Sequence, residues 1–522
     1  MKISKIKIKN FRSYQDETII LVKNMNIILG KNDAGKSSIL EALDIFFNDR
    51  DGAIKIESSD LNKTALTNGE SEITITVCFK EFDDKITLET VPTYISREYL
   101  LNADGEIEIT KVYQGKTMGS SVFIKAIHPA NDDFLKGLLL TKIKDLQKYV
   151  KDNSITVSGK EYVSSDLREA IRDSYGSLTF EEQYIPADKE GAKEIWEKIQ
   201  VKLPTYTLFQ SDRSNTDQDS EVQDPMNIAL KNILSEPEIV KQLTWVFERV
   251  KEESEKIAQG TLIQLQGINP TLASQLSTKP PAFEKLGWIK AFGKTEIETD
   301  SIPLNKRGSG VKRMILLSFF LNEVERRKNE ENLGNVIYAF EEPETSQHPE
   351  HQQILINAFK RLSESDGVQV ILTTHSPYVY KDCISDTSNQ LIYIGTTDTG
   401  EKSCTDIRDN WRSFTWSPSW GEINFYVYDL PTFEFFNELY GYIDEKRDKS
   451  VYRYADDVFV GLGGLSKSEK WTENSGTSYD TTYITCIRHK LHHPENTTGV
   501  DHRDKIKNAI DDMIQIISKI PK

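Results

Sequence analysis

The sequence predicts an α/β fold, and three segments carry this prediction. The apolar run 25–29 reads as a buried strand, and a glycine-bearing loop and a helical spacing of apolar residues over 38–47 follow it. Two more buried strands are predicted at 335–340 and 368–372, each running into polar side chains. The first segment, a strand followed by a loop and a helix, indicates which kind of α/β fold this is.

The loop 30–37 reads Gly-Lys-Asn-Asp-Ala-Gly-Lys-Ser and has the G-x-x-x-x-G-K-S spacing of a P-loop. Its glycines let backbone N–H groups surround phosphate oxygens, and the start of the helix adds positive potential. We expect Lys36 to reach the β- and γ-phosphates of ATP and the Ser37 hydroxyl to bind Mg²⁺. An ordinary strand-to-helix turn would not explain the Gly-Lys-Ser. The other expected ATP-binding residues of the loop are Gly30, Asn32, Gly35 and Ser38.

The strand at 335–340 ends in two acids, Glu341 and Glu342, which is the Walker B arrangement. We expect Glu341 to act on the Mg²⁺ shell and Glu342 to polarise the attacking water. An aspartate is commoner at the first acid, and the longer glutamate arm allows a metal contact through water. Taken alone, such a strand could enter a solvated loop, but the P-loop upstream favours the catalytic interpretation.

Two further features lie around this acidic strand. His375 follows the strand at 368–372, where the end of a parallel strand would place a sensor of the γ-phosphate. Gly308, Ser309 and Gly310 lead directly into an apolar helix, so free N–H groups face outward at a helix start. Most Gly-Ser-Gly triplets are flexible turns, and only the position before the acidic strand makes this one notable.

Composition restricts the class of protein. The chain has 522 residues, 38% of them hydrophobic and 28% charged, with a net charge of −16. This balance argues against a basic protein that coats nucleic acid, although a local basic groove remains compatible with it.

No apolar run is long enough for a membrane span, and the first residues alternate like a strand rather than a signal peptide. Four scattered cysteines suggest neither disulfides nor a zinc knuckle, so we expect a cytoplasmic protein without a membrane partner.

The order of P-loop, Gly-Ser-Gly helix start, Glu-Glu strand and strand-end histidine resembles the ABC-type ATPase heads of the OLD, SMC and recombination-repair group. The match is close to the OLD-like subgroup found in bacterial anti-phage systems, because 6–14 looks like its first strand and loop and 341–349 resembles its Walker B and D-loop region. The resemblance implies that Gly308, Ser309 and Gly310 bind the γ-phosphate of a nucleotide held by another copy. Two heads would then enclose two ATP molecules in a homodimer or higher oligomer.

The resemblance divides the chain into four parts. Residues 1–115 and 226–400 form the two parts of the ATPase head, and 116–225 a helical insertion with helices expected near 133–151 and 187–202. The insertion lacks sustained heptads, which argues against long coiled-coil arms. Residues 401–522 form a C-terminal domain. The predicted fold class is therefore α/β, an ABC-type P-loop ATPase head with a helical insertion and a mixed, mainly helical C-terminal domain.

OLD proteins also carry a TOPRIM nuclease, with a strand-end glutamate and a later Asp-x-Asp, and neither follows His375 in that arrangement. The architecture is therefore more similar to the ATPase subunit of Septu-type (PtuA-like) defence systems, some of which are associated with retrons. That resemblance implies a separate nuclease subunit of the HNH type as a partner. It also suggests a retron reverse transcriptase and its DNA as further partners.

Two C-terminal segments carry open alternatives. The aromatic helical pattern at 426–443 is either a packed face or a surface for a partner subunit. The segment 483–496 is predicted as a helix that Pro494 ends, with a cationic last turn that offsets the helix dipole. Alternatively, Arg488 and His493 resemble the arginine–histidine pair of HEPN ribonucleases, although the asparagine common after the arginine is replaced by His489. A zinc site from the clustered histidines is a third possibility, without an evident fourth ligand.

Three functions compete at this point. The first is a regulatory, ATP-hydrolysing subunit of an anti-phage complex, in which nucleotide restrains or positions a partner nuclease. The second makes this chain an ATP-gated RNase that uses Arg488 and His493. The third is a repair ATPase that clamps DNA, which the missing coiled coils and the acidic balance disfavour.

Overall fold

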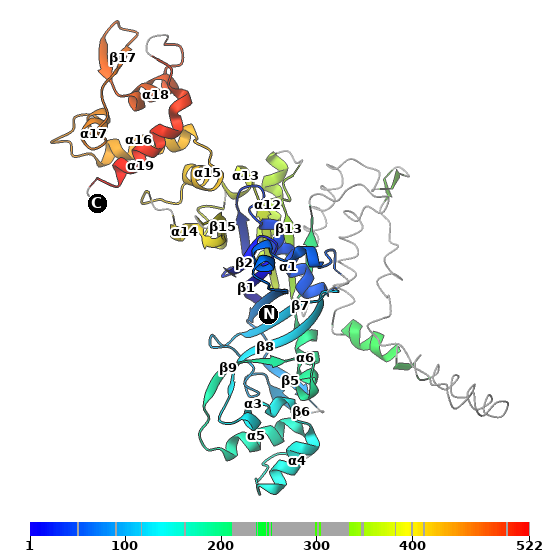
Figure 1. Ribbon diagram of the computed structural model, residues 1–522. Coiled ribbons are helices and arrows are strands. Elements are labelled where there is room, and N and C mark those ends of the chain that lie inside the picture. Colours follow the sequence, from blue (N-terminus) through cyan, green and yellow to red (C-terminus); the bar gives the residue numbers. More distant parts are fainter. Residues whose placement is uncertain are drawn as a thin grey trace. The chain divides into compact units, whose positions relative to one another are not determined.

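The structure is a computed structural model (Figure 1). It describes residues 1–210, apart from 50–51, 89–90, 116 and 161–162, and residues 334–520, apart from 346–348, 382, 398–399, 411–412 and 497–499. Between these parts it describes only 236, 238–246, 248–249, 252, 298–299 and 302–303. The predicted signature residues Gly308, Ser309 and Gly310 lie outside the described residues.

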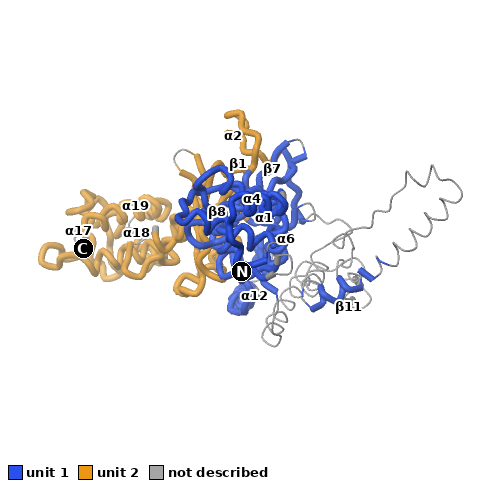
Figure 2. Tube along the Cα trace, turned by 90° about the horizontal axis from the view of Figure 1, so that it is seen from below, with its two compact units in different colours: residues 1–6, 40–58, 74–371 blue, residues 7–39, 59–73, 372–522 orange. Residues whose placement is uncertain are grey.

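The chain divides into two compact units (Figure 2). The first comprises residues 1–6, 40–58 and 74–371, and the second comprises 7–39, 59–73 and 372–522. The P-loop and His375 therefore belong to the second unit, whereas Glu341 and Glu342 belong to the first.

Two six-stranded sheets form the framework. The first has the strand order β2(Tyr14–Ile20), β1(Lys2–Phe11), β4(Glu72–Lys80), β7(Ile107–Gln114), β8(Gly119–Pro129) and β9(Phe180–Pro186). The second has the order β10(Thr205–Phe209), β13(Val336–Glu341), β14(Val368–Thr374), β3(Met25–Leu29), β15(Asn389–Thr396) and β16(Lys402–Asp406). All three strands that the sequence predicts around the site, β3, β13 and β14, belong to the second sheet.

The second sheet is mixed and its inner strands are apolar on both faces. β3 pairs in parallel with β15, with Ile27 opposite Leu391, and β10 pairs in parallel with β13, with Thr207 opposite Tyr338. β16 closes one edge antiparallel to β15. Every residue of β3 and β14 is buried, as expected for parallel strands covered on both faces.

Helices follow several strands of the second sheet in the chain. α1(Lys36–Asn48) begins inside the P-loop motif and extends the predicted helix at 38–47 by a few residues. α12(Pro349–Ser363) lies between β13 and β14 in the chain, and α13(Pro377–Lys381) comes directly after His375. Ile39, Leu43 and Phe46 form part of the buried face of α1.

A small lobe lies between β8 and β9 in the chain. It contains α3(Asp133–Lys136), the 3₁₀ turn η3(Leu138–Leu140), α4(Ile143–Asp152) and α5(Ser164–Ser174). The helix expected at 133–151 is thus broken, because Gly137 caps α3 and the chain tightens into a 3₁₀ turn before α4 starts. The helix expected at 187–202 is present as α6(Glu190–Lys202). The segment 116–225 also contributes β8, β9 and β10 to the sheets, and its boundaries as a domain stay predictions.

A buried ion-pair cluster joins α5 of this lobe to the segment between β6 and β7. The Glu98 carboxylate accepts hydrogen bonds from Arg168, at 2.8 and 3.0 Å, and from Arg172, at 3.2 Å. Burial opposes ionisation of Glu98, but the two guanidinium groups hold its pKa below the usual range. His128 lies beside this cluster, and burial lowers its pKa to about 4.

The C-terminal part is mainly helical. It contains α14(Ile407–Asn410), α15(Trp420–Tyr428), α16(Phe433–Lys446), α17(Ala455–Gly461), α18(Tyr483–His492), α19(Ile506–Ile517), the turn η6(Arg503–Lys505) and a hairpin of β17(Glu469–Thr472) and β18(Ser478–Thr481). Phe435, Leu439, Phe459, Ile484 and Ile510 belong to its apolar core. The aromatic pattern at 426–443 is two helices rather than one, because Asp429 adopts a left-handed conformation (φ 58°) and Pro431 follows it.

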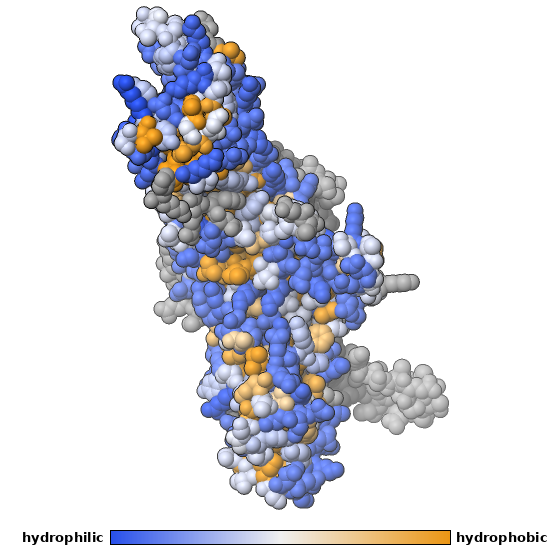
Figure 3. All heavy atoms as spheres, turned by 60° about the vertical axis from the view of Figure 1, so that its left-hand side comes forward, coloured by the Kyte–Doolittle hydropathy of each residue, from blue (hydrophilic) through white to orange (hydrophobic). Residues whose placement is uncertain are grey.

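The remaining short elements are η2(Ser58–Asp60), α2(Lys63–Thr67) and the two-stranded pairs β5(Lys85–Leu88) with β6(Val91–Tyr94) and β11(Glu298–Thr299) with β12(Ile302–Pro303). Within the described residues, no helix is long and apolar enough to cross a membrane. The face drawn in Figure 3 is largely hydrophilic, with hydrophobic residues in small groups. All four cysteines are free thiols.

Candidate nucleotide site

The P-loop holds its lysine in a defined position. The Lys36 side chain is only 4% exposed, and its ammonium donates hydrogen bonds to the carbonyl oxygens of Gly30 and Lys31, both at 3.0 Å. The backbone N–H of Ala34 donates to the same Lys31 carbonyl at 3.2 Å, which closes the turn. The lysine therefore lies across the opening of its own loop, where an ammonium can neutralise phosphate charge.

Gly35 is required by the backbone at this point. Its φ of +102° is a conformation that residues with a side chain rarely adopt. A Cβ there would lie 2.9 Å from Ser13 Oγ and 3.1 Å from the Tyr14 hydroxyl oxygen. The Tyr14 hydroxyl also donates to the Gly35 carbonyl at 3.0 Å, so the start of β2 holds the loop from outside.

The remaining predicted P-loop residues lie in the loop and in the first turn of α1. Ser37 and Ser38 occupy the first turn of α1, with Ser37 half-buried and Ser38 buried, and Asn32 is exposed. The buried Ser13 Oγ beside Gly35 has no hydrogen-bond partner among the described residues. A glycine-bearing loop at the start of α1, a buried ammonium and the unpartnered Ser13 hydroxyl fit a phosphate-bearing ligand with Mg²⁺.

The two glutamates lie at the end of β13, in the first unit. Glu341 is the last residue of β13, and Glu342 follows with a φ of 41°. A non-glycine residue in this conformation costs about 1–3 kcal/mol, and such strain is typical of functional sites. The Glu342 carbonyl accepts a hydrogen bond from Thr345 N–H at 3.1 Å, which fixes the turn.

Tyr206 of β10 is buried and is affected by the charge of Glu341. Burial raises the pKa of Tyr206 well above its usual range, and the carboxylates of Asp44, Glu41 and Glu341 raise it further. The Tyr206 hydroxyl donates to the Leu40 carbonyl of α1 at 2.6 Å. Within the first unit, this hydrogen bond connects β10 to α1.

His375 is exposed at the end of β14, where the sequence predicts a sensor. The preceding residue, Thr374, makes two hydrogen bonds. Its Oγ1 accepts one from the Ser376 N–H at 3.0 Å, and its carbonyl oxygen accepts one from the Tyr428 hydroxyl at 3.3 Å. The backbone next to His375 is therefore fixed by a residue of α15.

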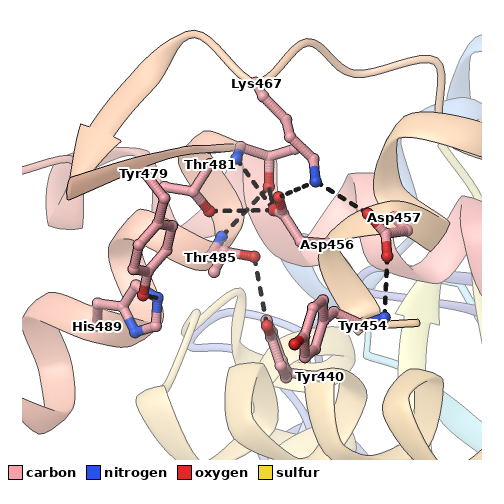
Figure 4. A network of polar contacts seen from close by, with 10 residues as sticks. Tyr440, Tyr454, Asp456, Asp457, Lys467, Tyr479, Thr481, Thr485 and His489 are labelled. Atoms are coloured by element: carbon pink, nitrogen blue, oxygen red, sulfur yellow. Dashed lines mark hydrogen bonds and ion pairs between the residues drawn. The ribbon is translucent and has the colours of Figure 1, made fainter. Parts of the chain in front are cut away.

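The C-terminal candidates lie on α18. The Arg488 guanidinium stacks over the Tyr440 ring at 4.5 Å, and His493 Nδ1 lies 3.4 Å from Glu495. His489, between them in sequence, contacts the Tyr479 hydroxyl through Nε2 at 3.1 Å (Figure 4). Burial lowers the pKa of His489, and the charges of Arg488 and His493 lower it further. These contacts leave the ribonuclease pair untested.

The helix start at α18 is stabilised by a buried aspartate. The Asp456 carboxylate accepts hydrogen bonds from Thr481 and Thr482, and Lys467 approaches it at 3.3 Å (Figure 4). In the part of the chain that the structure describes, no three His, Cys, Asp or Glu side chains are placed to hold a metal ion. The zinc interpretation of the histidines on α18 therefore has no structural support.

Sequence reasoning assigned no role to Ser13, Tyr14 or Tyr428. The first two approach the loop because β2 starts beside Gly35, and Tyr428 approaches Thr374 because α15 packs near the end of β14. Neither contact has a local sequence signal, since each joins segments that are distant in the chain.

Comparison with known proteins places the chain in a family. The family model described as AAA ATPase domain (AAA_15) matches residues 1–380. The chain is 26% identical over 384 residues to Endonuclease GajA of Bacillus cereus (strain VD045), which covers 72% of this chain and 56% of the relative. It is 22% identical over 392 residues to the Old nuclease of Escherichia phage P2, with the same two shares of 72% and 56%. The chain thus spans about half the length of these curated relatives.

Among solved structures, an SMC head bound to the C-terminal winged-helix domain of ScpA aligns with 78% of this chain and 97% of its own, at 13% identity and a TM-score of 0.37. This low score adds nothing to the family match. That match, with the sheets and helices described above, confirms the predicted α/β ATPase fold, and the assignment to the ABC type stays a prediction. The chain belongs to the AAA_15 family of AAA ATPase domains.

Proposed function

We propose that this chain is the ATP-binding and ATP-hydrolysing subunit of a bacterial anti-phage defence complex, in which it regulates or positions a partner nuclease of the HNH type. The observation that carries the ATPase part is the P-loop geometry, in which the buried Lys36 ammonium lies across the loop opening. The link to a nuclease is supported by the two curated relatives, which are named as nucleases, and the defence context follows from the sequence resemblance.

Each residue has a proposed role in the ATP site. Gly30, Asn32, Gly35, Lys36 and Ser38 bind the phosphates, and Ser37 and Glu341 hold Mg²⁺. A bound Mg²⁺ neutralises charge on the β- and γ-phosphate oxygens. Glu342 accepts a proton from the attacking water, and His375 contacts the γ-phosphate. The left-handed conformation of Glu342 supports this role, because strained residues cluster where chemistry requires a fixed geometry.

A complete site requires a second copy of the chain in this proposal. Gly308, Ser309 and Gly310 of one copy bind the γ-phosphate of ATP held by the other, so ATP joins two heads. Hydrolysis then releases the contact and changes the state of the assembly.

The nuclease belongs to a partner in this proposal. The family match ends at residue 380, and the helical core that follows has no assigned chemistry of its own. We assign this C-terminal domain to partner binding, with an HNH nuclease as the first partner and a retron reverse transcriptase with its DNA as a second.

The competing proposal is that the chain cuts RNA itself. Arg488 lies in the middle of α18 and His493 is its C-cap residue, and both act electrostatically on His489. Cleavage by this pair would need no divalent metal and would leave a 2′,3′-cyclic phosphate, because the histidine activates the ribose 2′-hydroxyl.

One experiment separates the two proposals. The purified chain is incubated with total RNA and plasmid DNA, with and without ATP and Mg²⁺. ATP hydrolysis without cleavage supports the regulatory role, and addition of the candidate nuclease subunit should then produce ATP-dependent cleavage. RNA cleavage that stops in His493→Ala, but not in the neighbouring exposed control His492→Ala, would overturn the regulatory role.

A further inference from the structure

The helix α15 connects the C-terminal domain to the chain segment that follows β14. Trp420 Nε1 donates to the Pro377 carbonyl at 3.3 Å, and the Tyr380 hydroxyl donates to Asn424 Oδ1 at 3.0 Å. The ring of Tyr428 stacks nearly parallel on that of Tyr380, with centroids 5.8 Å apart. Three successive turns of α15 are therefore attached to α13 and to the segment around it.

Asp429, the C-cap residue of α15, lies near the ammonium groups of two lysines. Asp429 adopts the left-handed conformation that caps the helix, and its carboxylate accepts a hydrogen bond from Lys507 of α19. The other carboxylate oxygen lies 3.9 Å from the ammonium of Lys31. The hydrogen bond from Lys507 lowers the pKa of Asp429, and the charge of Lys31 contributes in the same direction.

Lys31 belongs to the P-loop. It directly follows Gly30, and its carbonyl is one of the two acceptors of the Lys36 ammonium. Asp429 consequently places a negative charge beside the loop that binds phosphates. Lys31 is 55% exposed and Asp429 50%, so both side chains can change partner without breaking buried contacts.

A bound triphosphate alters the balance at Asp429. Phosphate oxygens in the loop attract the Lys31 ammonium and repel the Asp429 carboxylate, because charges closer to one another than the Debye length interact even through water. The carboxylate then has Lys507 as its remaining cation. Nucleotide in the P-loop would thus strengthen the contact between the end of α15 and α19.

We propose that Asp429 links nucleotide occupancy of the P-loop to the C-terminal helical domain, because it loses Lys31 and keeps Lys507 when phosphates bind. This inference rests on the proposed ATP binding at Lys36 and specifies how that site communicates with the domain assigned to the partner. The coupling is reciprocal, so a partner that pulls Lys507 away from Asp429 weakens nucleotide binding.

Two substitutions give effects of opposite sign. Asp429→Asn keeps the side-chain shape and the left-handed conformation, which asparagine tolerates, but removes the charge. It frees Lys31 and removes a repulsion, so ATP binds about two- to fivefold tighter, the range expected for an exposed ion pair. Lys507→Met leaves Asp429 with Lys31 as its cation, so ATP binds about twofold more weakly.

The test measures the Kd of a non-hydrolysable ATP analogue for the full-length chain at low salt and at about 0.5 M salt, where the Debye length of about 4 Å screens the exposed charges. Hydrogen exchange of residues 506–517 is followed with and without the analogue. The wild type is expected to gain protection in α19 on binding, and Asp429→Asn to lose that gain. Asp480→Asn, an exposed aspartate on β18, is the matched control.

Each outcome has one meaning. Opposite shifts of Kd in the two variants, both reduced at high salt, support the link. Equal Kd values in Asp429→Asn, Lys507→Met and the control overturn it while leaving ATP binding intact. Absence of any analogue binding that depends on Lys36 overturns the proposed function and the link together.

Discussion

The substitution Gly35→Ala tests whether the P-loop geometry is as strained and as crowded as the structure indicates. Gly35 has a φ of +102°, and an added Cβ would lie 2.9 Å from Ser13 Oγ and 3.1 Å from the hydroxyl oxygen of Tyr14. Both contacts are closer than a carbon and an oxygen normally approach. The loop must therefore move or Tyr14 must lose its hydrogen bond to the Gly35 carbonyl.

The cost of this substitution has two parts. An alanine with positive φ costs about 1–3 kcal/mol in backbone strain. Loss of the Tyr14 hydrogen bond adds about 1 kcal/mol. Gly69 provides a matched control, because its φ is +79° and an added Cβ there meets nothing within 4 Å. Gly69→Ala should therefore show backbone strain alone.

Urea unfolding measures the free energy of unfolding of both variants, and titration with a fluorescent ATP analogue measures Kd. We expect Gly35→Ala to lose about 1–2 kcal/mol more than Gly69→Ala, the size of one hydrogen bond plus a close contact. We also expect Gly35→Ala to bind nucleotide at least about tenfold more weakly, because about 1.4 kcal/mol of lost binding free energy corresponds to a factor of ten in Kd. Equal stability and equal Kd in the two variants would refute the derived loop geometry.

Two further predictions concern the buried cluster around Glu98. Glu98→Gln leaves the buried guanidinium groups of Arg168 and Arg172 without a counter-charge, so it should cost about 3–5 kcal/mol in the free energy of unfolding. Glu169→Gln, an exposed neighbour on α5 whose carboxylate lies 3.9 Å from Arg97, should cost less than about 1 kcal/mol, and equal costs would contradict the assignment. For His128, the folded pKa of about 4 lies below the ordinary value of 6.5, so the unfolded chain binds the proton first and stability rises with pH between those values. The free energy of unfolding measured from pH 4 to 7 should rise less steeply in His128→Gln than in the wild type, and identical slopes would show that His128 does not titrate as derived.

The parts of the site that local sequence patterns encode could be predicted. β3 coincides with the predicted strand at 25–29, and the helix start at Lys36 follows from the spacing of the P-loop glycines. β13 ends at Glu341 as predicted, because an apolar run followed by paired acids marks a strand that leaves the core. Each of these features depends on fewer than about fifteen consecutive residues, which is the scale on which periodicity is informative.

Long-range contacts could not be predicted in the same way. Tyr14 approaches Gly35, and Asp429 approaches Lys31, only because sheet pairing and helix packing bring separate segments together. The left-handed φ of Glu342 is likewise imposed by the turn that follows β13, since glutamate itself does not favour it. The break between α15 and α16 did have a local signal in Pro431, which the aromatic periodicity across 426–443 concealed.

The measurement that tests the central claim most directly is ATP turnover by the purified wild type, Glu342→Gln and Lys36→Ala, with bound nucleotide quantified in the same samples. The account predicts that the wild type hydrolyses ATP, that Glu342→Gln retains ATP in a joined pair of heads without turnover, and that Lys36→Ala binds none. Equal turnover in the wild type and Glu342→Gln would contradict the assignment of Glu342 as the catalytic base.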